Sequence, residues 1–547
     1  MKYNQILSSP RLKRTLTFGD SEGTFCEGND PRLNPGLIFG VREDLASNTP
    51  TVAYVNLYKD VIPKPKTEFF ENHPIFKGIY RCNVADDGTV NAVYGDASFA
   101  YDGSNGQVMT RFGKYWYREE FDGDYRYRWA SPIPIEGFEV SMGFYKDDTS
   151  PRRELDEFFI GTFTGCVFDV TADAYEVNTI AITNAATESG NLTITLDGHY
   201  AFTVAVDVGD DTPTKVADKI RAAGNKTDSF GVEWVVSGAD ENVIYTADTP
   251  GLKNTVTMPE ANGVTRTITK TTTGKGGYTT HDAAGVDFTA TSGDKLSSVA
   301  GVLSASGMNN SLHIVNSRVL AKNRGDGWQL VDGEQLAAIQ TLFMFRYGTR
   351  HSQSIYRGVC DEATGTRNHS HFTGFSAGSW VAAGGEDAGN AGWENTSKAS
   401  GSREFSALAV ENFYGNLWWW VDGINIRGSP NWGEVWVCNH TFESNKFSTP
   451  YINYGTVVNT NAAWQYIKSM LPGQLMIPDA HQTNAAHYYC DGIYTRATSD
   501  VTARVVPFGG RWSSADLVGA SCLPLDNDST SANRAIGARI AFVKPSV

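Results

Sequence analysis

The sequence contains no apolar run that approaches the roughly 18–20 residues needed to span a bilayer as a helix. Residues 1–16 also lack the apolar core of a secretory signal peptide. These absences argue against a membrane protein and against export. We expect a chain that is made and folded in a cytoplasm and has no membrane partner.

Charged residues are scarce, at 20% of the chain, and the formal net charge is −15. A nucleic-acid-binding surface needs clustered lysine and arginine, which an acidic chain of this kind does not favour. Nucleic acid is therefore not an expected partner.

Cysteine is sparse as well, with seven residues at positions 26, 82, 166, 360, 438, 490 and 522. The number is odd, the spacings are long and no CxxC pair occurs, which argues against a disulfide framework or a zinc site. Free buried thiols are the simpler interpretation. His369 and His371 have no third ligand in view, and residues 526–528 do not match an EF-hand loop. We expect no metal and no cofactor.

Glycine and aromatic residues are plentiful instead, with 55 Gly, 13 Trp, 24 Tyr and 28 Phe in 547 residues. Low charge together with many Gly, Thr, Asn and aromatic residues is typical of a β-rich, loop-rich protein. The predicted fold class is α+β, mostly β. Four regions are expected, at residues 1–68, 69–174, 175–290 and 291–547.

Residues 1–68 are punctuated by Pro, Gly, Asn and Asp, which predicts an irregular N-terminal arm that docks onto another protein. Region 69–174 reads as the β-rich first part of a body. It contains two expected hairpins, one pairing 79–84 with 90–94 and one pairing 107–118 with 125–131.

Region 175–290 is rich in Thr, Val and Ala and predicts an inserted, small β-sandwich-like domain with one helix. Apolar residues alternate over 192–196 and 202–206 on either side of Asp197-Gly198, which indicates a hairpin. Thr212 and Pro213 predict the start of a helix that ends at Gly224. Further strands are expected near 232–236, 243–247 and 265–273, followed by a glycine-rich hinge at 274–277.

Region 291–547 opens with two expected helices. The first is capped by Asn309, Asn310 or Ser311 and runs to about Ala321, and the second runs from about Gly333 to Tyr347. The long loop 361–404, with Trp380 and Trp393, is interpreted as either a wall of a binding site or a subunit contact.

Three segments in this region are expected to hold the fold together: 411–423 (ENFYGNLWWWVDG), 504–512 (RVVPFGGRW) and 537–542 (GARIAF). Paired Gly-Asn and Gly-Gly residues permit tight turns and close backbone approach before buried tryptophans. The arginine in the last segment can hydrogen-bond loop carbonyls or a carboxylate, in a final strand that closes the sheet. The residues expected to be architectural are Asn412, Gly415, Asn416, Trp418, Trp420, Gly509, Gly510, Gly537 and Arg539.

The order of these segments resembles that in C-type-lectin-like domains of the formylglycine-generating-enzyme superfamily. More widely, residues 70–170 and 296–547 are similar to a group of tailed-bacteriophage structural proteins, through segments such as 103–117, 135–139, 158–163 and 325–328. The resemblance implies a C-type-lectin-like body into which the middle region is inserted.

The resemblance also implies a function without catalysis: a virion protein, such as a tail fibre or tail-tip adhesin, that binds a host surface glycan or protein. The N-terminal arm would contact other virion proteins, and such proteins commonly assemble as homotrimers. A non-adhesive head fibre, decoration or tail-assembly protein is the alternative. A formylglycine-generating-type oxidase is a minor alternative, because that chemistry needs two reactive cysteines in the late loops and Cys522 stands alone between Gly510 and Gly537.

In phage proteins of this type, the ligand lies between the G-G-x-W segment and the last strand. The matching stretch here is dense in small hydrogen-bonding side chains, with a tryptophan as a possible stacking platform. A solvated loop with Asx and Ser turns is the competing interpretation. The candidate ligand-binding residues are Trp512, Ser513, Ser514, Asp516, Asp526, Asn527, Asp528, Ser529, Thr530, Ser531 and Asn533.

Overall fold

The computed structural model describes most of the chain. The described ranges are 36–147, 152–198, 200–228, 232–251, 253–278, 287–307, 312–361, 370–371, 373–374, 376, 404–429, 432–458, 463–495 and 503–545. Two short parallel strands are also described, β1 (Thr17–Phe18) and β2 (Thr24–Phe25).

Four sheets make up the body. In spatial order, sheet 1 consists of β11 (Glu139–Val140), β9 (Trp116–Asp122), β10 (Tyr125–Ser131), β3 (Phe39–Asp44), β4 (Ala53–Val55) and β5 (Val61–Ile62). Sheet 2 consists of β24 (Trp328–Leu330), β36 (Ile540–Phe542), β14 (Glu157–Gly161), β8 (Gln107–Gly113), β6 (Tyr80–Val84) and β7 (Val90–Val93).

Sheet 3 consists of β29 (Ile452–Val458), β28 (Trp432–Val437), β27 (Trp418–Ser429) and β33 (Ala503–Phe508), and β35 (Ile536–Ala538) pairs in parallel with β27. Sheet 4 consists of β31 (Pro478–Gln482), β30 (Ala463–Met470), β32 (Gly492–Thr495) and β34 (Leu523–Pro524). Two small hairpins accompany them: β12 (Tyr145–Lys146) with β13 (Arg153–Glu154), and β25 (Ser406–Ala407) with β26 (Val410–Glu411).

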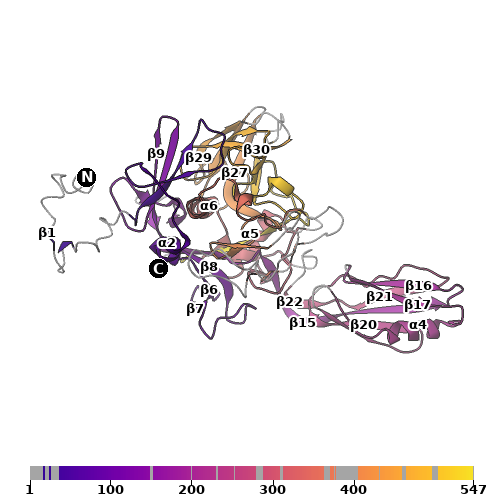
Figure 1. The fold of residues 1–547 in the computed structure, drawn as a ribbon. Helices are drawn as coiled ribbons and strands as arrows, with labels where there is room; N and C mark the ends of the chain where they lie inside the picture. Colours follow the sequence, from indigo (N-terminus) through magenta and orange to yellow (C-terminus); the bar gives the residue numbers. More distant parts are fainter. Residues whose placement is uncertain are drawn as a thin grey trace.

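Helix α6 (Gly333–Tyr347) lies at the centre of the body (Figure 1). All of its residues are buried. Asp332 and Gln335 form a capping box at its start, and Gly348 ends it at a φ of 70°. The largest hydrophobic cluster combines α6 with side chains from all four sheets, among them Val41, Phe158, Val421 and Ile467. The sheets therefore surround the helix in a propeller-like arrangement of four blades.

The remaining helices of the described chain are short, and the one over residues 213–222 packs in a hydrophobic cluster separate from this core. They are α2 (Thr67–Asn72), α3 (Pro74–Lys77), α4 (Pro213–Ala222) and α5 (Ile314–Lys322), with 3-10 turns η1 (Met142–Phe144), η3 (Ser352–Ser354) and η5 (Ala515–Leu517). Strand accounts for 42% and helix for 12% of the described residues, which confirms a mostly-β protein. The C-type-lectin-like character of the body stays a prediction.

A separate unit projects from the body (Figure 1). Its main sheet orders β18 (Lys226–Thr227), β19 (Glu233–Ser237), β20 (Asn242–Pro250), β15 (Cys166–Asn184) and β21 (Thr265–Thr272). The hairpin β16 (Gly190–Leu196) with β17 (Tyr200–Val206) and helix α4 cover this sheet, and the unit has its own hydrophobic cluster. We call it the middle unit. Its hairpin, strands and helix, including the Thr212 cap, were predicted correctly.

The base of the middle unit corrects one expectation. The glycine-rich stretch at 274–277 was expected to be a hinge, but it enters strand β22 (Lys275–Tyr278), which pairs with β15. The N–H of Gly276 donates to Asp169 Oδ2 at 3.0 Å, and the rings of Phe168 and Tyr278 pack 5.1 Å apart. β15 also pairs with β23 (Lys295–Ser297), so paired strands carry the chain out of the body and back.

The prediction of an irregular arm over residues 1–68 was wrong for residues 36–68. β3 lies between β10 and β4, and Phe39, Val41 and Tyr54 are buried in the body. Phe39 and Val41 belong to a mostly buried strand, and the turn-forming residues on either side of it concealed this strand in the sequence. Apart from β1 and β2, residues 1–35 lie outside the described part of the chain.

Two further expectations need correction. The strand expected over 107–118 is broken into β8 and β9, which belong to different sheets, because Tyr115 turns inward and its hydroxyl donates to the carbonyl of Ala338 on α6 at 2.9 Å. Helix α5 starts after His313, whose Nδ1 accepts the N–H of Asn316 at 3.4 Å. The caps expected for it, Asn309 to Ser311, lie outside the described residues. The hairpin of β6 with β7 and the helix at 333–347 were predicted correctly.

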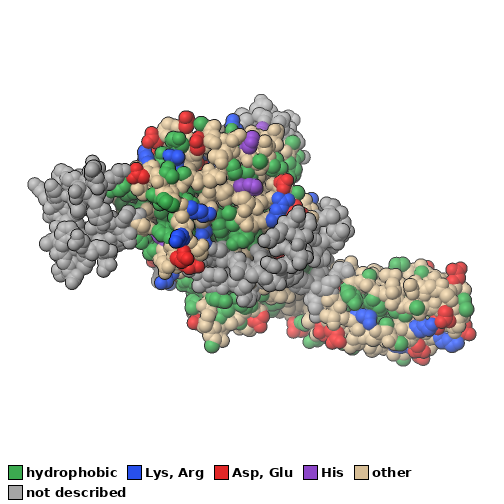
Figure 2. Space-filling view, viewed as in Figure 1, with side chains coloured by type: hydrophobic (Ala, Val, Ile, Leu, Met, Phe, Trp, Pro, Cys, Tyr) green, Lys and Arg blue, Asp and Glu red, His purple; other side chains and the backbone are tan. Residues whose placement is uncertain are grey.

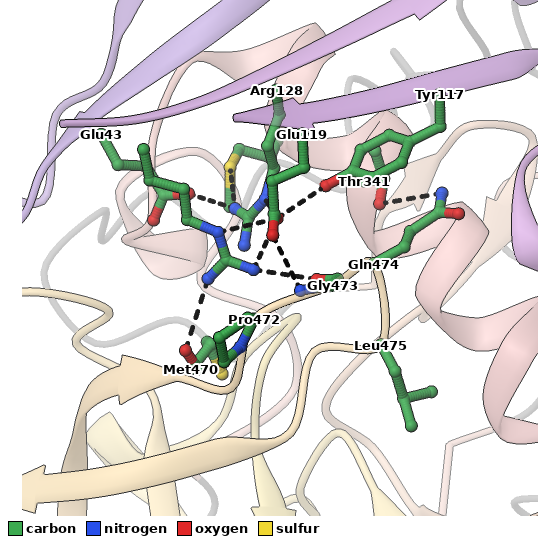
Figure 3. Close-up of polar contacts among 12 residues, drawn as sticks. Glu43, Tyr117, Glu119, Arg128, Thr341, Met470, Pro472, Gly473, Gln474 and Leu475 are labelled. Carbon is green, nitrogen blue, oxygen red and sulfur yellow. Dashed lines mark hydrogen bonds and ion pairs between the residues drawn. The ribbon is translucent and has the colours of Figure 1, made fainter. Parts of the chain in front are cut away.

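A buried ionic network joins sheet 1 to the segment that links β30 and β31 (Figure 3). On β10, Arg128 contacts the carboxylate of Glu43 on β3, and Arg126 Nε donates to Glu119 Oε2 on β9 at 2.8 Å. Arg126 also donates to the carbonyl of Gly473 at 2.8 Å, and the N–H of Gly473 donates to Glu119 Oε1 at 2.8 Å. Each charge therefore has a partner of opposite sign, as burial requires.

Glu43→Gln is expected to destabilise the body. Burial alone would raise the pKa of Glu43, but Arg128, Arg126 and Arg350 hold it below its usual value, so the carboxylate is the form that these guanidiniums need. Removing the charge of Glu43 leaves buried guanidinium groups without enough negative charge beside them, which lowers the free energy of unfolding by about 3–5 kcal/mol. Scanning calorimetry of the full chain should show a lower thermal midpoint for the body.

The matched control is Glu120→Gln on β9. Its side chain is 31% exposed and pairs with Lys59, and the expected loss is at most about 1 kcal/mol. Equal losses for the two variants would contradict a structural role for the buried network.

Ile194→Ala is expected to destabilise the middle unit alone. Ile194 is fully buried in the cluster of that unit, and truncating such a side chain costs about 2–5 kcal/mol. Calorimetry should show a shift of one transition while the transition of the body stays in place. Thr193→Ala, on the exposed face of the same strand, is the control. A parallel shift of both transitions would show that the two cores unfold as one.

Candidate functional site

The G-G-x-W segment forms a sharp turn after β33. Gly509 and Gly510 have φ values of 94° and 97°, and a Cβ on Gly510 would lie 2.5 Å from Val518 Cγ2. Only glycine satisfies both the backbone conformation and the close approach. The turn directs Trp512 into the protein. The backbone N–H of Trp512 donates to the carbonyl of Asn416 at 3.1 Å.

Trp512 is not available as a stacking platform. Its side chain is only 6% exposed and belongs to a hydrophobic cluster with Trp418 and Trp420. The interpretation of this tryptophan as a ligand-contacting residue was therefore wrong. It packs the interior because the two preceding glycines turn the chain inward.

The first polar stretch, 513–516, leads into η5 and is held by segment 353–361. Ser513 and Ser514 are half-buried, and Ser514 Oγ accepts the N–H of Arg511 at 3.3 Å. Asp516 is exposed and pairs with Arg357 at 2.7 Å. This arrangement is a partly exposed turn that the ion pair and the hydrogen bonds between Ala515 and both Gln353 and Cys360 fix in place.

The second polar stretch, 526–533, is anchored both through its backbone and through two of its side chains. The carbonyl of Asn527 accepts the N–H of Val505 at 2.8 Å, and the carboxylate of Asp528 contacts Arg504. Its other end is fixed because Asn533 Oδ1 accepts the N–H of Ala535 at 2.8 Å. The side chains that remain accessible are the exposed Asp528, Thr530 and Asn533 and the half-buried Asp526, Asn527, Ser529 and Ser531.

The structure gives the two polar stretches different neighbours. Segment 353–361 holds the first, whereas β33 and the N–H of Gly307, which donates to the carbonyl of Asn533 at 3.0 Å, hold the second. The second stretch, which together with Arg534 is called the polar loop below (526–534), offers the larger set of accessible hydrogen-bonding groups.

An aromatic cluster that sequence analysis did not single out borders the polar loop. Trp464 on β30 is 39% exposed and stacks on Trp418 with ring centroids 5.8 Å apart and planes at 19°. Tyr494 on β32 is the cross-strand neighbour of Trp464, and the centroids of these two rings lie 5.4 Å apart. Trp464, Tyr466 and Lys468 occupy every second position of β30, a spacing that indicates a strand in the sequence. This spacing does not reveal which aromatic ring is exposed.

The residues of segment 411–420 are buried and hold the framework. The carboxylate of Glu411 accepts the N–H groups of Gly374 and Ser376, each at 2.8 Å, and Asn412 Oδ1 accepts the N–H of Phe405 at 3.3 Å. Gly415, at a φ of 77°, donates its N–H to the carbonyl of Gly509 at 3.1 Å.

Asn416 and Trp420 tie two further segments to this framework. Asn416 Oδ1 accepts the N–H of His371 at 2.7 Å, and Trp420 Nε1 donates to the carbonyl of Leu312 at 3.4 Å. The imidazole of His371 contacts the carboxylate of Glu404. Arg367, His369, Trp380 and Trp393 lie outside the described residues.

Arg539 is completely buried and hydrogen-bonds loop carbonyls. Nη1 donates to the carbonyls of Gly161 at 2.7 Å and Thr162 at 3.0 Å, and Nη2 donates to those of Glu411 at 3.0 Å and Asn412 at 3.1 Å. One guanidinium therefore joins the end of β14 to segment 411–412. Gly537 next to it is required because an added Cβ would lie 2.4 Å from the carbonyl oxygen of Ala305.

Asp491 supports the segment that leads from η5 to β34. Its Oδ2 accepts the N–H of Ser521 at 2.8 Å and the hydroxyl of Ser352 at 2.9 Å. A Cβ on Gly519 would lie 2.1 Å from Oδ1, so the carboxyl sits directly under this segment. Burial raises the pKa of Asp491 to about 8, although both hydrogen bonds act in the opposite direction.

The described cysteines are buried, and none of these six forms a disulfide with another. Burial raises the pKa of Cys522 well above its usual value and that of Cys490 to about 12. Neither thiol is set up to ionise near neutral pH, which does not favour the cysteine chemistry of a formylglycine-generating-type oxidase.

In the part of the chain that the structure describes, no group of three or more His, Cys, Asp or Glu side chains is placed to hold a metal ion. Within the same residues, no helix is both long and apolar enough to cross a membrane. Comparison with protein-family models and with curated proteins finds no match for this chain.

Asp491→Asn is expected to flatten the pH dependence of stability. The folded-state pKa of about 8 lies above the ordinary value of 3.8, so folding favours the protonated form. The free energy of unfolding should therefore fall as the pH rises from about 4 towards 8, by up to about 1.4 kcal/mol per pH unit from this group. Asparagine keeps an acceptor for Ser352 and Ser521 but does not ionise.

Urea unfolding of the two proteins at several pH values between 5 and 8 measures this difference. The variant should lose less stability than the wild type as the pH rises. Asp326→Asn, which alters an exposed carboxylate, serves as the control and should follow the wild type. Parallel curves for Asp491→Asn and the wild type would show that Asp491 does not titrate in this range.

Proposed function

We propose that this chain is a structural protein of a tailed-bacteriophage virion, a tail fibre or tail-tip adhesin whose C-type-lectin-like body presents a receptor-binding surface. The observation that carries the proposal is the position of the last strand. β36 lies between β24 and β14, and Arg539 next to it joins the end of β14 to Glu411 and Asn412, at the start of one of the segments that resemble the lectin-like signatures. The framework residues are internal, and the polar loop beside them is accessible.

The accessible groups of the polar loop suit polar recognition of a host surface molecule. They are carboxylate, hydroxyl and amide groups carried by a loop whose backbone is anchored at both ends. Anchoring reduces the conformational entropy that binding would otherwise cost. A homotrimer attached to other virion proteins through the N-terminal residues completes the proposal.

A non-adhesive head fibre, decoration or tail-assembly protein is the second candidate. The middle unit favours it, because this unit projects from the body, has its own core and could contact neighbouring subunits (Figure 1). Antibodies raised against the middle unit and applied to intact particles distinguish the two candidates. Labelling of the tail tip or fibres supports the adhesin, and labelling confined to the head supports the alternative.

Thr530→Arg is expected to weaken binding of the full-length chain to host cells by about tenfold or more, because a bulky cation replaces a small exposed hydroxyl at the centre of the polar loop. Binding is measured with fluorescently labelled protein by flow cytometry. Thr193→Arg, an exposed substitution in the middle unit, is the matched control and should bind like the wild type. Equal binding of all three proteins would contradict the adhesin proposal at this loop.

A further inference from the structure

Trp464 stands out among the tryptophan side chains that the structure describes, because the others are buried or half-buried. It is also held in one orientation. Trp418 stacks against one face of the indole, and Tyr494 packs against it in an edge-type contact. Trp464 nevertheless remains 39% exposed to solvent. A large aromatic surface that is both rigid and accessible is suited to binding a ligand at low entropic cost.

Both ends of the polar loop meet this aromatic cluster. At the start, Pro524 pairs with Tyr494, and the N–H of Leu525 donates to the carbonyl of Tyr494 at 2.9 Å. At the end, the N–H of Trp418 donates to the carbonyl of Ala535 at 3.0 Å. The polar loop therefore begins beside Tyr494 and ends beside Trp418, and both of these residues pack against Trp464.

Charge near this surface is balanced. Asp526 and Asp528 provide two carboxylates. The buried Arg504 contacts Asp528, and the exposed Arg534 provides a second guanidinium. On the face of the molecule that Figure 2 shows, basic and acidic side chains are likewise scattered and not gathered by sign. The surface therefore has no excess charge with which to select an anion or a cation.

We propose that Trp464 and the polar loop bind a pyranose ring of an uncharged polysaccharide, an inference that rests on the proposed adhesin function and names its ligand class. A pyranose has an apolar C–H face, which can lie on the indole, and a rim of hydroxyl groups. Asp526, Asn527, Thr530 and Asn533 offer acceptors and donors to that rim. Trp512, the tryptophan expected to stack on a ligand, is buried, and Trp464 takes that role.

The test uses the full-length chain and a panel of neutral hexose polymers, namely glucans, galactans and mannans, with uronic-acid polymers for comparison. Affinity gel electrophoresis measures retardation by each polymer. The wild type should be retarded by at least one neutral polymer, and Trp464→Ala should lose about tenfold in affinity for it. Trp464→Phe, which keeps an aromatic face, should recover part of the loss.

Phe121→Ala is the matched control, because Phe121 is 48% exposed on sheet 1 and distant in topology from the polar loop. It should bind like the wild type, and the thermal midpoints of all variants establish that they are folded. Wild-type protein that no neutral polymer retards, or that only uronic-acid polymers retard, overturns the inference. Equal effects of Trp464→Ala and Phe121→Ala overturn it as well.

Two further outcomes separate this inference from the adhesin proposal. If the wild type binds host cells and Trp464→Ala binds them equally well, the adhesin proposal stands and the saccharide site is wrong. If a neutral polymer retards the wild type but host cells do not bind it, the saccharide site stands and the adhesin proposal fails. Mass photometry completes the set, because loss of oligomers in Trp464→Ala without any saccharide binding would assign Trp464 to a subunit interface.

Discussion

A helix without a solvent face places the strongest demand on this fold. Every side of α6 must be covered, and its polar residues must find partners inside the protein. Gln340 Nε2 donates to the carbonyl of Ala520 at 2.7 Å, and Asn439 Nδ2 donates to Glu334 Oε2 at 2.8 Å. Segments far apart in the chain are therefore drawn to one element, which is why four separate sheets converge on it.

The same principle operates beneath the candidate site. Arg539, Asp491 and Glu411 are buried polar residues whose hydrogen bonds go mainly to the backbone of irregular segments. Loops of this kind cannot satisfy their backbone groups with one another as strands do, so side chains from the interior complete them. The surface then combines a defined backbone with side chains that are accessible to solvent.

Local patterns in the sequence were sufficient where structure is local. Helix 333–347, the hairpin across Asp197-Gly198 and the Thr212 cap follow from periodicity, turn residues and capping. The break at Tyr115 could not be predicted, because it depends on an acceptor on α6. The exposure of each tryptophan could not be predicted from the sequence either. Trp464 and Trp512 both lie near polar residues, and only tertiary packing determines which one is covered.

The way in which the middle unit is attached has a consequence for the history of the chain. It leaves and re-enters the body along paired strands, β15 with β22 and β23, so its two ends are neighbours. Acquiring or deleting such a module changes the distance between the flanking residues of the body very little, and the entropic penalty of closing that gap is small. The body can therefore exchange this module for another, or dispense with it, as a self-contained cassette.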